Sequence, residues 1–270
     1  MIGPLIGMVH LGPLPGAPRF DGDFDAIVKA AVADARTLVE AGFDALLVEN
    51  YGDAPFFADD VPKVTVAAMT RAVAAIRGEV SLPVGVNVLR NDGPAALAVA
   101  AATGAQFIRV NVLTGSMSTD QGLITGRAAE LARLRSSLGS GIRILADVFV
   151  KHAVPPPGLT IEQAARDTFD RGPADALVIT GSATGRAPAT ALLERVRTAV
   201  PKAPLLAGSG ATADTVGQLL ETCDGVIVGT AIKVGGVTTQ PVDPERADSF
   251  VRAARSGKSG SPQRRGGSPA

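Results

Sequence analysis

The sequence has few of the residues that several kinds of site require. Cys223 is the one cysteine in 270 residues, so neither a disulfide framework nor a cysteine-based zinc site is available. The two histidines, His10 and His152, are too few for a histidine-rich metal centre. We therefore predict no resident metal. Mg²⁺ held by Glu49 and Asp147 is the alternative, because this ion needs only oxygen ligands.

The sequence also lacks an excess of charge of either sign. Basic and acidic residues number 26 each, and a net charge of zero argues against a nucleic-acid partner or an acidic membrane surface. The longest apolar run, Ala95–Ala102, is far shorter than the roughly 20 residues of a membrane span. The first 20 residues contain four prolines and no basic leader pattern. We expect no nucleic-acid partner, no stable membrane insertion and a cytoplasmic location.

The charge is unevenly distributed along the chain. Residues 256–270 contain three basic residues and no acidic residue, and they consist mainly of Gly, Ser and Pro without periodicity, so residues 1–255 carry a net charge of about −3. Such a composition is typical of a disordered tail. The apolar content of 46% is sufficient for a large core. We predict one folded domain over 1–255 and a disordered tail over 256–270.

One pattern repeats along residues 1–255: a short apolar run, a polar or Gly-rich loop, and an Ala- and Leu-rich stretch at helical spacing. The runs are continuous rather than alternating, as in parallel strands covered on both faces. The predicted strands are Leu5–Val9, Ala45–Glu49, Val84–Val88, Phe107–Val112, Ile142–Val148, Ala176–Ile179, Pro204–Ala207 and Gly225–Val228. The predicted helices are Phe24–Ala41, Val64–Arg77, Pro94–Thr103, Leu123–Leu138, Thr160–Arg171, Ala189–Val200, Thr212–Thr222 and Pro244–Arg255.

Eight such units predict an α/β protein with a single (β/α)₈ barrel, the TIM barrel. A doubly wound sheet is the alternative, but it rarely reaches eight regular units without a second domain. No G-x-G-x-x-G motif follows the first strand, which removes the main support for a dinucleotide-binding sheet.

Polar residues gather at the carboxyl ends of the first five predicted strands, where such barrels have their active sites. The candidate catalytic residues are His10, Glu49, Asp147 and Lys151. The candidate substrate-binding residues are Asn87, Arg109, Asn111 and His152. Each has a structural alternative. His10 could be an ordinary core or loop histidine, and Glu49 or Asp147 could form a buried ion pair with Arg109. The asparagines could cap loops, and Lys151 and His152 could be ordinary surface residues of a loop.

The loops after the last three strands contain small residues instead. Glycines allow backbone N–H groups to approach an anion, hydroxyl side chains add donors, and helix N-termini are expected to follow each loop. In these barrels a phosphate commonly binds after strands 7 and 8. The predicted phosphate-binding residues are Gly181, Ser182, Thr184, Gly208, Ser209, Gly210, Gly229 and Thr230. The alternative is that short loops use glycine for their turns alone.

Several segments resemble one known family, the BtpA family, and the resemblance covers residues 1–255. They are Gly7–Pro18 (GMVHLGPLPGAP), Asp44–Phe56 (DALLVENYGDAPF), Gly85–Asp92 (GVNVLRND), Phe107–Val112 (FIRVNV), Ala146–His152 (ADVFVKH) and Asp175–Gly185 (DALVITGSATG). The resemblance implies a (β/α)₈ barrel. It also implies a link of one cyanobacterial member to photosystem I biogenesis or stability, although relatives occur in organisms without photosynthesis. It carries no catalytic residues over to this chain.

Together these features predict an enzyme for a phosphorylated sugar or a ribosyl- or nucleoside-like compound. Isomerisation, lyase chemistry and glycosyl cleavage are the candidate reactions. Asp147 or Glu49 would act as general acid or base, His10 would polarise the substrate or shuttle a proton, and Lys151 could form a Schiff base. The alternative is a non-catalytic assembly or stability factor for a membrane photosynthetic complex. The Ala-rich helices are compatible with packing between subunits, and we expect a homo-oligomer.

Overall fold

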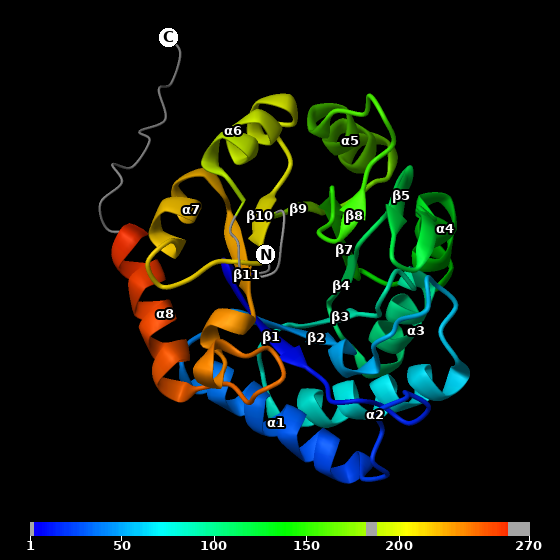
Figure 1. The fold of residues 1–270 in the computed structure, drawn as a ribbon, viewed down its shortest axis with the longest axis vertical. Coiled ribbons are helices and arrows are strands. Elements are labelled where there is room, and N and C mark those ends of the chain that lie inside the picture. Colours follow the sequence, from blue (N-terminus) through cyan, green and yellow to red (C-terminus); the bar gives the residue numbers. More distant parts are fainter. Residues whose placement is uncertain (1–2, 182–187, 259–270) are drawn as a thin grey trace.

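The computed structural model describes residues 3–181 and 188–258, and within them parallel strands form a closed barrel surrounded by helices (Figure 1). The eight barrel strands are β1 (Leu5–His10), β2 (Ala45–Glu49), β3 (Val84–Asn87), β4 (Phe107–Val110), β7 (Arg143–Val148), β9 (Ala176–Thr180), β10 (Leu205–Gly208) and β11 (Gly225–Val228). Their order around the ring is β1, β11, β10, β9, β7, β4, β3, β2, and pairing of β11 with β1 closes it. The predicted (β/α)₈ fold is confirmed.

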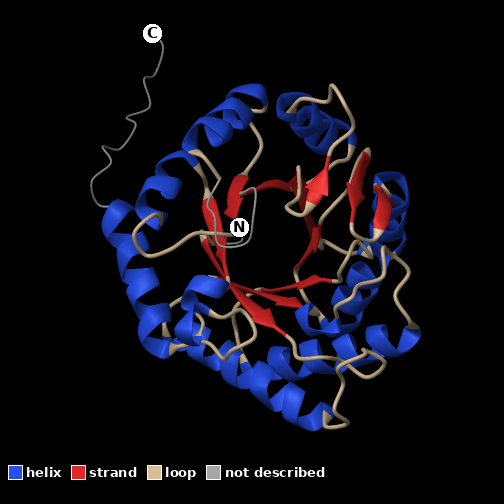
Figure 2. Cartoon of the chain, viewed as in Figure 1, coloured by secondary structure: helices blue, strands red, loops and turns tan. Residues whose placement is uncertain are grey.

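Helices cover the outside of the barrel (Figure 2). They are α1 (Phe24–Glu40), α2 (Lys63–Glu79), α3 (Gly93–Thr103), α4 (Ala128–Ser137), α5 (Ile161–Arg166) with a π-helical turn at Asp167–Arg171, α6 (Thr190–Ala199), α7 (Val216–Thr222) and α8 (Pro244–Lys258). Their first turns carry N-caps where the sequence supplies a carboxylate. Asp23 accepts a hydrogen bond from the Ala26 N–H, and Asp92 accepts one from the Ala95 N–H. No helix in the described ranges combines the length and the apolarity needed to cross a membrane.

The helix predicted at Leu123–Leu138 is wrong in its first turn. Leu123 lies in β6 (Gly122–Thr125), which pairs with β5 (Ser116–Thr119) and, through it, with the two-residue strand β8 (Ala153–Val154) in a small antiparallel sheet. Ile124 is 3% exposed and Leu123 is 66% exposed, which is the alternation of a strand. Leu123 and Ile124 fitted the helical spacing of the prediction because α4 begins only a few residues after them.

The helix predicted at Thr212–Thr222 begins four residues later, at Val216. The Thr212 N–H donates to Thr215 Oγ1 at 3.0 Å, and the Thr212 carbonyl accepts from the Thr215 N–H at 3.2 Å. These bonds form a turn that competes with the first helical turn. The loop after β10 therefore extends to Thr215, and no helix N-terminus directly follows the predicted phosphate-binding residues Gly208, Ser209 and Gly210.

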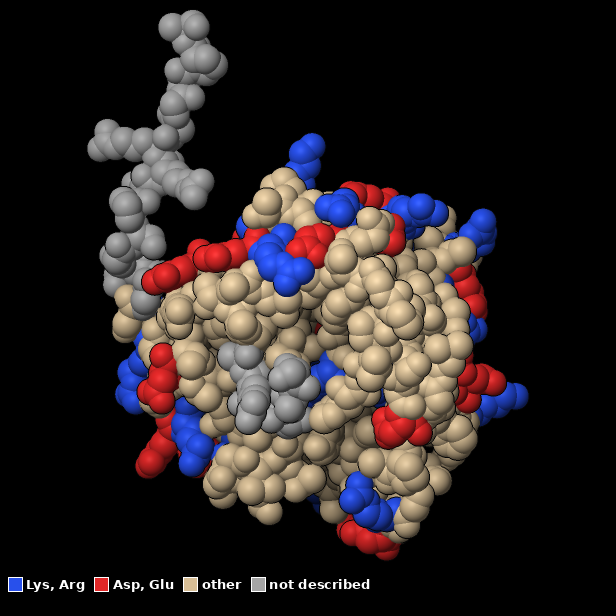
Figure 3. Space-filling model, turned by 45° about the horizontal axis from the view of Figure 1, so that its top comes forward, with Lys and Arg blue, Asp and Glu red and all other residues tan. Residues whose placement is uncertain are grey.

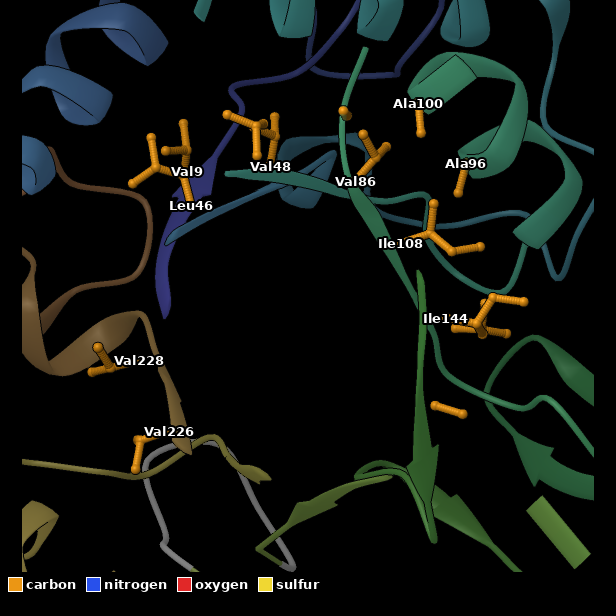
Figure 4. Close-up of a cluster of buried hydrophobic side chains, with 14 of the residues drawn as sticks. Val9, Leu46, Val48, Val86, Ala96, Ala100, Ile108, Ile144, Val226 and Val228 are labelled. Carbon is orange, nitrogen blue, oxygen red and sulfur yellow. The ribbon is translucent and has the colours of Figure 1, made fainter. Parts of the chain in front are cut away.

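The alternation of side chains along the strands divides the core into two layers. Outward-facing residues such as Val9, Val48 and Ile108 pack against the helices, and Figure 4 shows Ile108 near Ala96 and Ala100 of α3. The inward-facing residues near the amino ends of the strands are apolar and fill the barrel. They are Ile6, Met8, Ala45, Leu47, Phe107, Leu145, Ala176, Val178, Leu206 and Ile227. The same alternation makes polar residues point inward at the carboxyl ends of the strands, next to these apolar residues.

Candidate active site

Five predicted site residues point inward at the carboxyl ends of neighbouring strands. His10 ends β1, Glu49 ends β2, Asn87 ends β3, and Arg109 and Asp147 lie on β4 and β7. Each has the same parity as the apolar residue two positions before it in the barrel interior, apart from Asn87, which follows Gly85. Gly85 has no side chain because the Phe107 ring occupies that space, 2.1 Å from where a Cβ would lie. The local strand pattern therefore brings these residues together.

Arg109 and Asp147 form a buried ion pair. Arg109 Nη2 lies 3.0 Å from both Asp147 oxygens, and the Asp147 side chain is fully buried. The Asn111 amide donates to Asp147 at 3.2 Å, and the Asn87 amide donates to Asn111 at 3.1 Å. Burial raises the pKa of Asp147, and the charge and hydrogen bonds of Arg109 oppose the rise. This is the ion pair that the sequence left open as an alternative role for Asp147.

Glu49 stands apart from this pair. Its side chain receives no hydrogen bond from any described residue, and its one recorded ion-pair contact there is with His10, whose Nε2 lies 3.8 Å from Glu49 Oε1. Burial raises the pKa of Glu49, although Arg109 and Lys151 act to lower it. A carboxyl that is buried, unbonded and raised in pKa has the properties of a proton-transferring group.

His10 is neutral at physiological pH. Burial, and then the positive charges of Lys233 and Lys151, lower its pKa to about 3. Nδ1 is buried and has no hydrogen-bond partner among the described residues. A neutral imidazole can polarise a substrate oxygen or relay a proton, but it adds no charge to the site.

A cavity of about 510 Å³ opens at this end of the barrel. Ten predicted residues line it: His10, Glu49, Arg109, Asn111, Lys151, His152, Ser209, Gly210, Gly229 and Thr230. Asn87, Asp147 and Gly208 are not part of its lining, so Glu49 is the carboxylate that faces the cavity. Four basic side chains line it against this one acid, and Figure 3 shows basic atoms near the middle of the face, with acidic side chains mostly towards its edge. The cavity therefore favours an anionic ligand.

The loops after β10 and β11 form one wall of this cavity. Ser209 and Gly210 have φ values of 65° and 76°, and no acceptor among the described residues bonds to the N–H groups of Gly210, Ala211, Gly229 or Thr230. Free N–H donors beside a cavity are what a phosphate requires. Gly181 is buried after the end of β9. Ser182 and Thr184 lie outside the described residues.

Two of these glycines leave space for side chains of the barrel interior. A Cβ at Gly229 would lie 2.7 Å from His10 Cε1, and a Cβ at Gly208 would lie 2.6 Å from Val178 Cγ1 and 3.7 Å from Arg109 Nη2. Their lack of a side chain therefore serves packing as well as any contact to a ligand. Neither Gly208 nor Gly229 has a positive φ, so a turn that favours glycine does not explain why these two positions lack a side chain.

Lys151 and His152 lie in the turn after β7, beyond the strand end at Val148. The Lys151 N–H donates to Thr180 Oγ1 at 3.2 Å, which turns the chain towards the cavity. Burial lowers the pKa values of both side chains. Both line the cavity, where Lys151 is partly buried and His152 is exposed, so the surface alternative still applies to His152.

Sequence reasoning assigned no role to Arg90. This residue is 6% exposed, lines the cavity and donates from Nη2 to the Lys151 carbonyl at 2.6 Å. Its position just after a barrel strand could have indicated a site residue. The two residues that follow it, however, have structural roles. Asn91 exchanges two hydrogen bonds with the Val112 backbone, and Asp92 caps α3. Thr238 and Thr239 also line the cavity. They come from the segment between β11 and α8, where no sequence pattern indicated a site.

The polar groups present do not fit the Mg²⁺ alternative. No group of three His, Cys, Asp or Glu residues suited to a metal occurs in the described part of the chain. The oxygens of Asp147 accept hydrogen bonds from Arg109 and Asn111, and Glu49 faces cationic neighbours. These two carboxylates therefore do not form a joint cation site.

The fold is shared with barrel enzymes of distant sequence. Tryptophan synthase of Mycobacterium tuberculosis superimposes with a TM-score of 0.62 at 20% identity, covering 94% of this chain and 93% of that chain. Thiamine phosphate pyrophosphorylase of Pyrococcus furiosus gives 0.58 at 14% identity, covering 94% and 96%. N-(5'-phosphoribosyl)anthranilate isomerase of the same organism gives 0.55 at 16% identity, covering 93% and 98%. At these identities the likeness concerns the fold alone.

Sequence comparison reaches closer relatives. A Thermococcus kodakarensis protein described as uncharacterized is 52% identical over 254 residues, covering 93% of this chain and 95% of its own. The photosystem I biogenesis protein BtpA of a Synechocystis strain is 45% identical over 261 residues, covering 97% and 91%. The model of the BtpA family matches residues 1–256. This chain therefore belongs to the BtpA family.

Proposed function

We propose that this barrel is an enzyme acting on a phosphorylated sugar or a ribosyl- or nucleoside-like compound. The observation that carries the proposal is the division of one cavity into two walls. The free N–H groups of Gly210 and Thr230 form the wall after β10 and β11, and Glu49 and Arg109 belong to a second wall at the ends of β2 and β4. A phosphate bound at the first wall would present the rest of its molecule to the second.

Proton transfer is assigned to Glu49. Its carboxyl faces the cavity and has a raised pKa, whereas the Asp147 carboxylate is occupied by Arg109. Asp147 then orients Arg109, which binds a substrate oxygen. Neutral His10, 3.8 Å from Glu49, polarises the same region of the substrate. Isomerisation, lyase chemistry and glycosyl cleavage all use such a proton-transferring pair.

Lys151 is the candidate for covalent chemistry. Its lowered pKa increases the fraction of free amine, and its side chain lines the cavity. A Schiff base would form by attack of that amine on a substrate carbonyl with loss of water. Borohydride reduction in the presence of ribose 5-phosphate should trap a covalent adduct on Lys151 by mass spectrometry if the reaction takes this route, and an unmodified lysine assigns the chemistry to acid–base steps alone.

Binding is tested by crystallography. Crystals grown without phosphate and soaked with ribose 5-phosphate should show its phosphate within hydrogen-bond distance of the Gly210 and Thr230 N–H groups. Phosphate bound elsewhere, or no binding at saturating concentration, contradicts the proposal.

Turnover is tested by ³¹P NMR with a panel of phosphorylated pentoses and nucleosides. Glu49→Gln should lower any turnover by about 10²- to 10⁴-fold while ribose 5-phosphate still binds. Equal turnover by the wild type and this variant removes Glu49 from the mechanism. Asp147→Asn is the comparison, and it should act mainly on substrate affinity through Arg109.

The name of the Synechocystis relative favours a second candidate function, that of an assembly or stability factor for a photosynthetic membrane complex. Typical interface anchors are scarce in this chain, which has no Trp and one Tyr. Co-purification with pigment-protein subunits from the native organism, undiminished in Glu49→Gln, would support this function. Loss of any such association together with turnover would tie it to the enzyme.

A further inference from the structure

Arg90 is a buried cation with no carboxylate within ion-pair distance, and the charges of Asp147, Glu49 and Asp120 act on it from farther away. Three basic side chains are buried among the described residues, and the other two have ion pairs: Arg109 with Asp147 at 3.0 Å and Lys233 with Asp34 at 2.5 Å. No described carboxylate forms an ion pair with Arg90. The residues outside the described ranges contain no Asp or Glu, so the sequence offers no further side-chain carboxylate.

An unpaired charge of this kind is expensive to bury. The guanidinium does not lose its proton at physiological pH, so the charge persists. Of its five N–H donors, one has a recorded acceptor, the Lys151 carbonyl at 2.6 Å. The side chain lines the cavity, from which a ligand can reach the remaining donors. The arrangement indicates a site that is completed by an anion.

Arg90 follows a strand on the far side of the barrel ring from Gly210, and its guanidinium reaches the loop after β7. It follows β3, and Gly210 follows β10. In the ring order β1, β11, β10, β9, β7, β4, β3, β2, these two strands are four steps apart in either direction (Figure 1). The Lys151 carbonyl that holds the Arg90 guanidinium follows β7, and β9 separates β7 from β10. A second group on the same molecule can therefore reach Arg90 while a phosphate is at Gly210.

We propose that the substrate carries a second anionic group besides its phosphate, and that Arg90 binds this group. The inference rests on the phosphate site of the proposed function. A carboxylate matches best, because a guanidinium can donate to both of its oxygens. Lys151, whose carbonyl holds Arg90, is a second basic side chain that lines the same cavity.

Matched ligand pairs test this inference by calorimetry. Glycerol 3-phosphate and 3-phosphoglycerate differ in a terminal hydroxymethyl or carboxylate, and so do ribitol 5-phosphate and 5-phosphoribonate. In at least one pair the wild type should bind the carboxylate at least 10-fold more tightly. Arg90→Met should abolish this preference and leave the affinity for the phosphate alcohol unchanged. The control Arg252→Met, on the exposed surface of α8, should keep it.

Equal affinities within both pairs for the wild type, or a preference retained by Arg90→Met, overturn the inference and leave the phosphate site intact. Failure of all four ligands to bind overturns the phosphate site and the inference with it. If thermal denaturation shows that Arg90→Met does not fold, Arg90→Lys takes its place. That variant keeps the charge but loses the paired donors, and a preference as strong as that of the wild type would count against the assignment.

Discussion

At the scale of single residues, Glu49 is expected to weaken the fold. Burial raises the pKa of its carboxyl, so the folded protein binds this proton more tightly than the unfolded chain does. Stability therefore falls as the pH rises from the unfolded pKa through the folded one, and the full cost is present above the folded pKa. We expect Glu49→Gln to be about 1 kcal/mol more stable than the wild type at pH 8 in urea titrations.

This gain should disappear below about pH 4, where the carboxyl is protonated in both states. Glu162→Gln is the matched control, because hydrogen bonds from Arg195 lower the pKa of Glu162 to about 2 and the sign is reversed. That variant should gain nothing at pH 8. A Glu49→Gln protein less stable than the wild type at pH 8 would show that the carboxylate has a stabilising partner.

The Arg109–Asp147 pair supplies a second prediction at this scale. Asp147→Asn leaves a buried guanidinium without its counter-ion, and we expect the free energy of unfolding to fall by about 3–5 kcal/mol. Adding Arg109→Met should restore a large part of that loss, since the unpaired charge is then gone. Chemical denaturation of both single variants and the double variant measures the coupling energy. A loss below about 1 kcal/mol for Asp147→Asn would mean that this pair contributes little.

At the scale of elements, the segment between β11 and α8 depends on a contact with α1. Asp34 of α1 accepts from Lys233 Nζ at 2.5 Å and from the Val242 N–H at 2.7 Å. The same segment supplies Thr230 and Thr238 to the cavity, and their hydroxyls are 2.8 Å apart. We expect Asp34→Ala to increase amide hydrogen exchange over residues 230–242 and to weaken ribose 5-phosphate binding about 10-fold, although Asp34 does not line the cavity.

Asp248→Ala is the control for that prediction. Asp248 forms an exposed ion pair with Arg252 within α8. Such a pair contributes little, so exchange and binding should remain as in the wild type. Increased exchange without weaker binding in Asp34→Ala would indicate that the segment does not shape the phosphate site.

Helices and strands could be predicted from the sequence where one hydrophobic pattern continued along the whole element. Continuous apolar runs identified every barrel strand, because strands covered on both faces need no alternation. The sheet containing Leu123 was missed because its three short strands bury one face only, and β5 and β6 run for four residues each. The start of α7 was missed because Thr215 bonds locally to Thr212.

The site was predictable as a location more than as a set of contacts. Strand parity predicted that Arg109 and Asn111 project to the same side, and both lie beside Asp147. Parity does not distinguish a carboxylate held by an arginine from one that faces a cavity, because that depends on where long side chains end. Arg90 was missed because it lies beyond the end of β3, where the alternation of strand side chains no longer applies.

At the scale of the whole molecule, the cavity joins the first and last strands of the ring. His10 and Glu49 come from β1 and β2, the wall proposed to bind phosphate comes from the loops after β10 and β11, and β1 pairs with β11. A ligand that bridges these strand ends binds the closed barrel and not the open chain. At 100 times its Kd, ribose 5-phosphate should add about 2.7 kcal/mol to the free energy of unfolding. For a chain of this size we expect a rise in Tm of about 5–10 °C.

Gly229→Ala separates that effect from general stabilisation by salt or sugar. The added Cβ would lie 2.7 Å from His10 Cε1 and must displace the ring or the loop beside it. The variant should have a lower Tm without ligand and a much smaller rise with ribose 5-phosphate in calorimetric scans, while ribose should have no effect on either protein. An equal rise in the two proteins would place the phosphate away from the ends of β10 and β11, because a ligand bound elsewhere on the barrel is indifferent to the contact between Gly229 and His10.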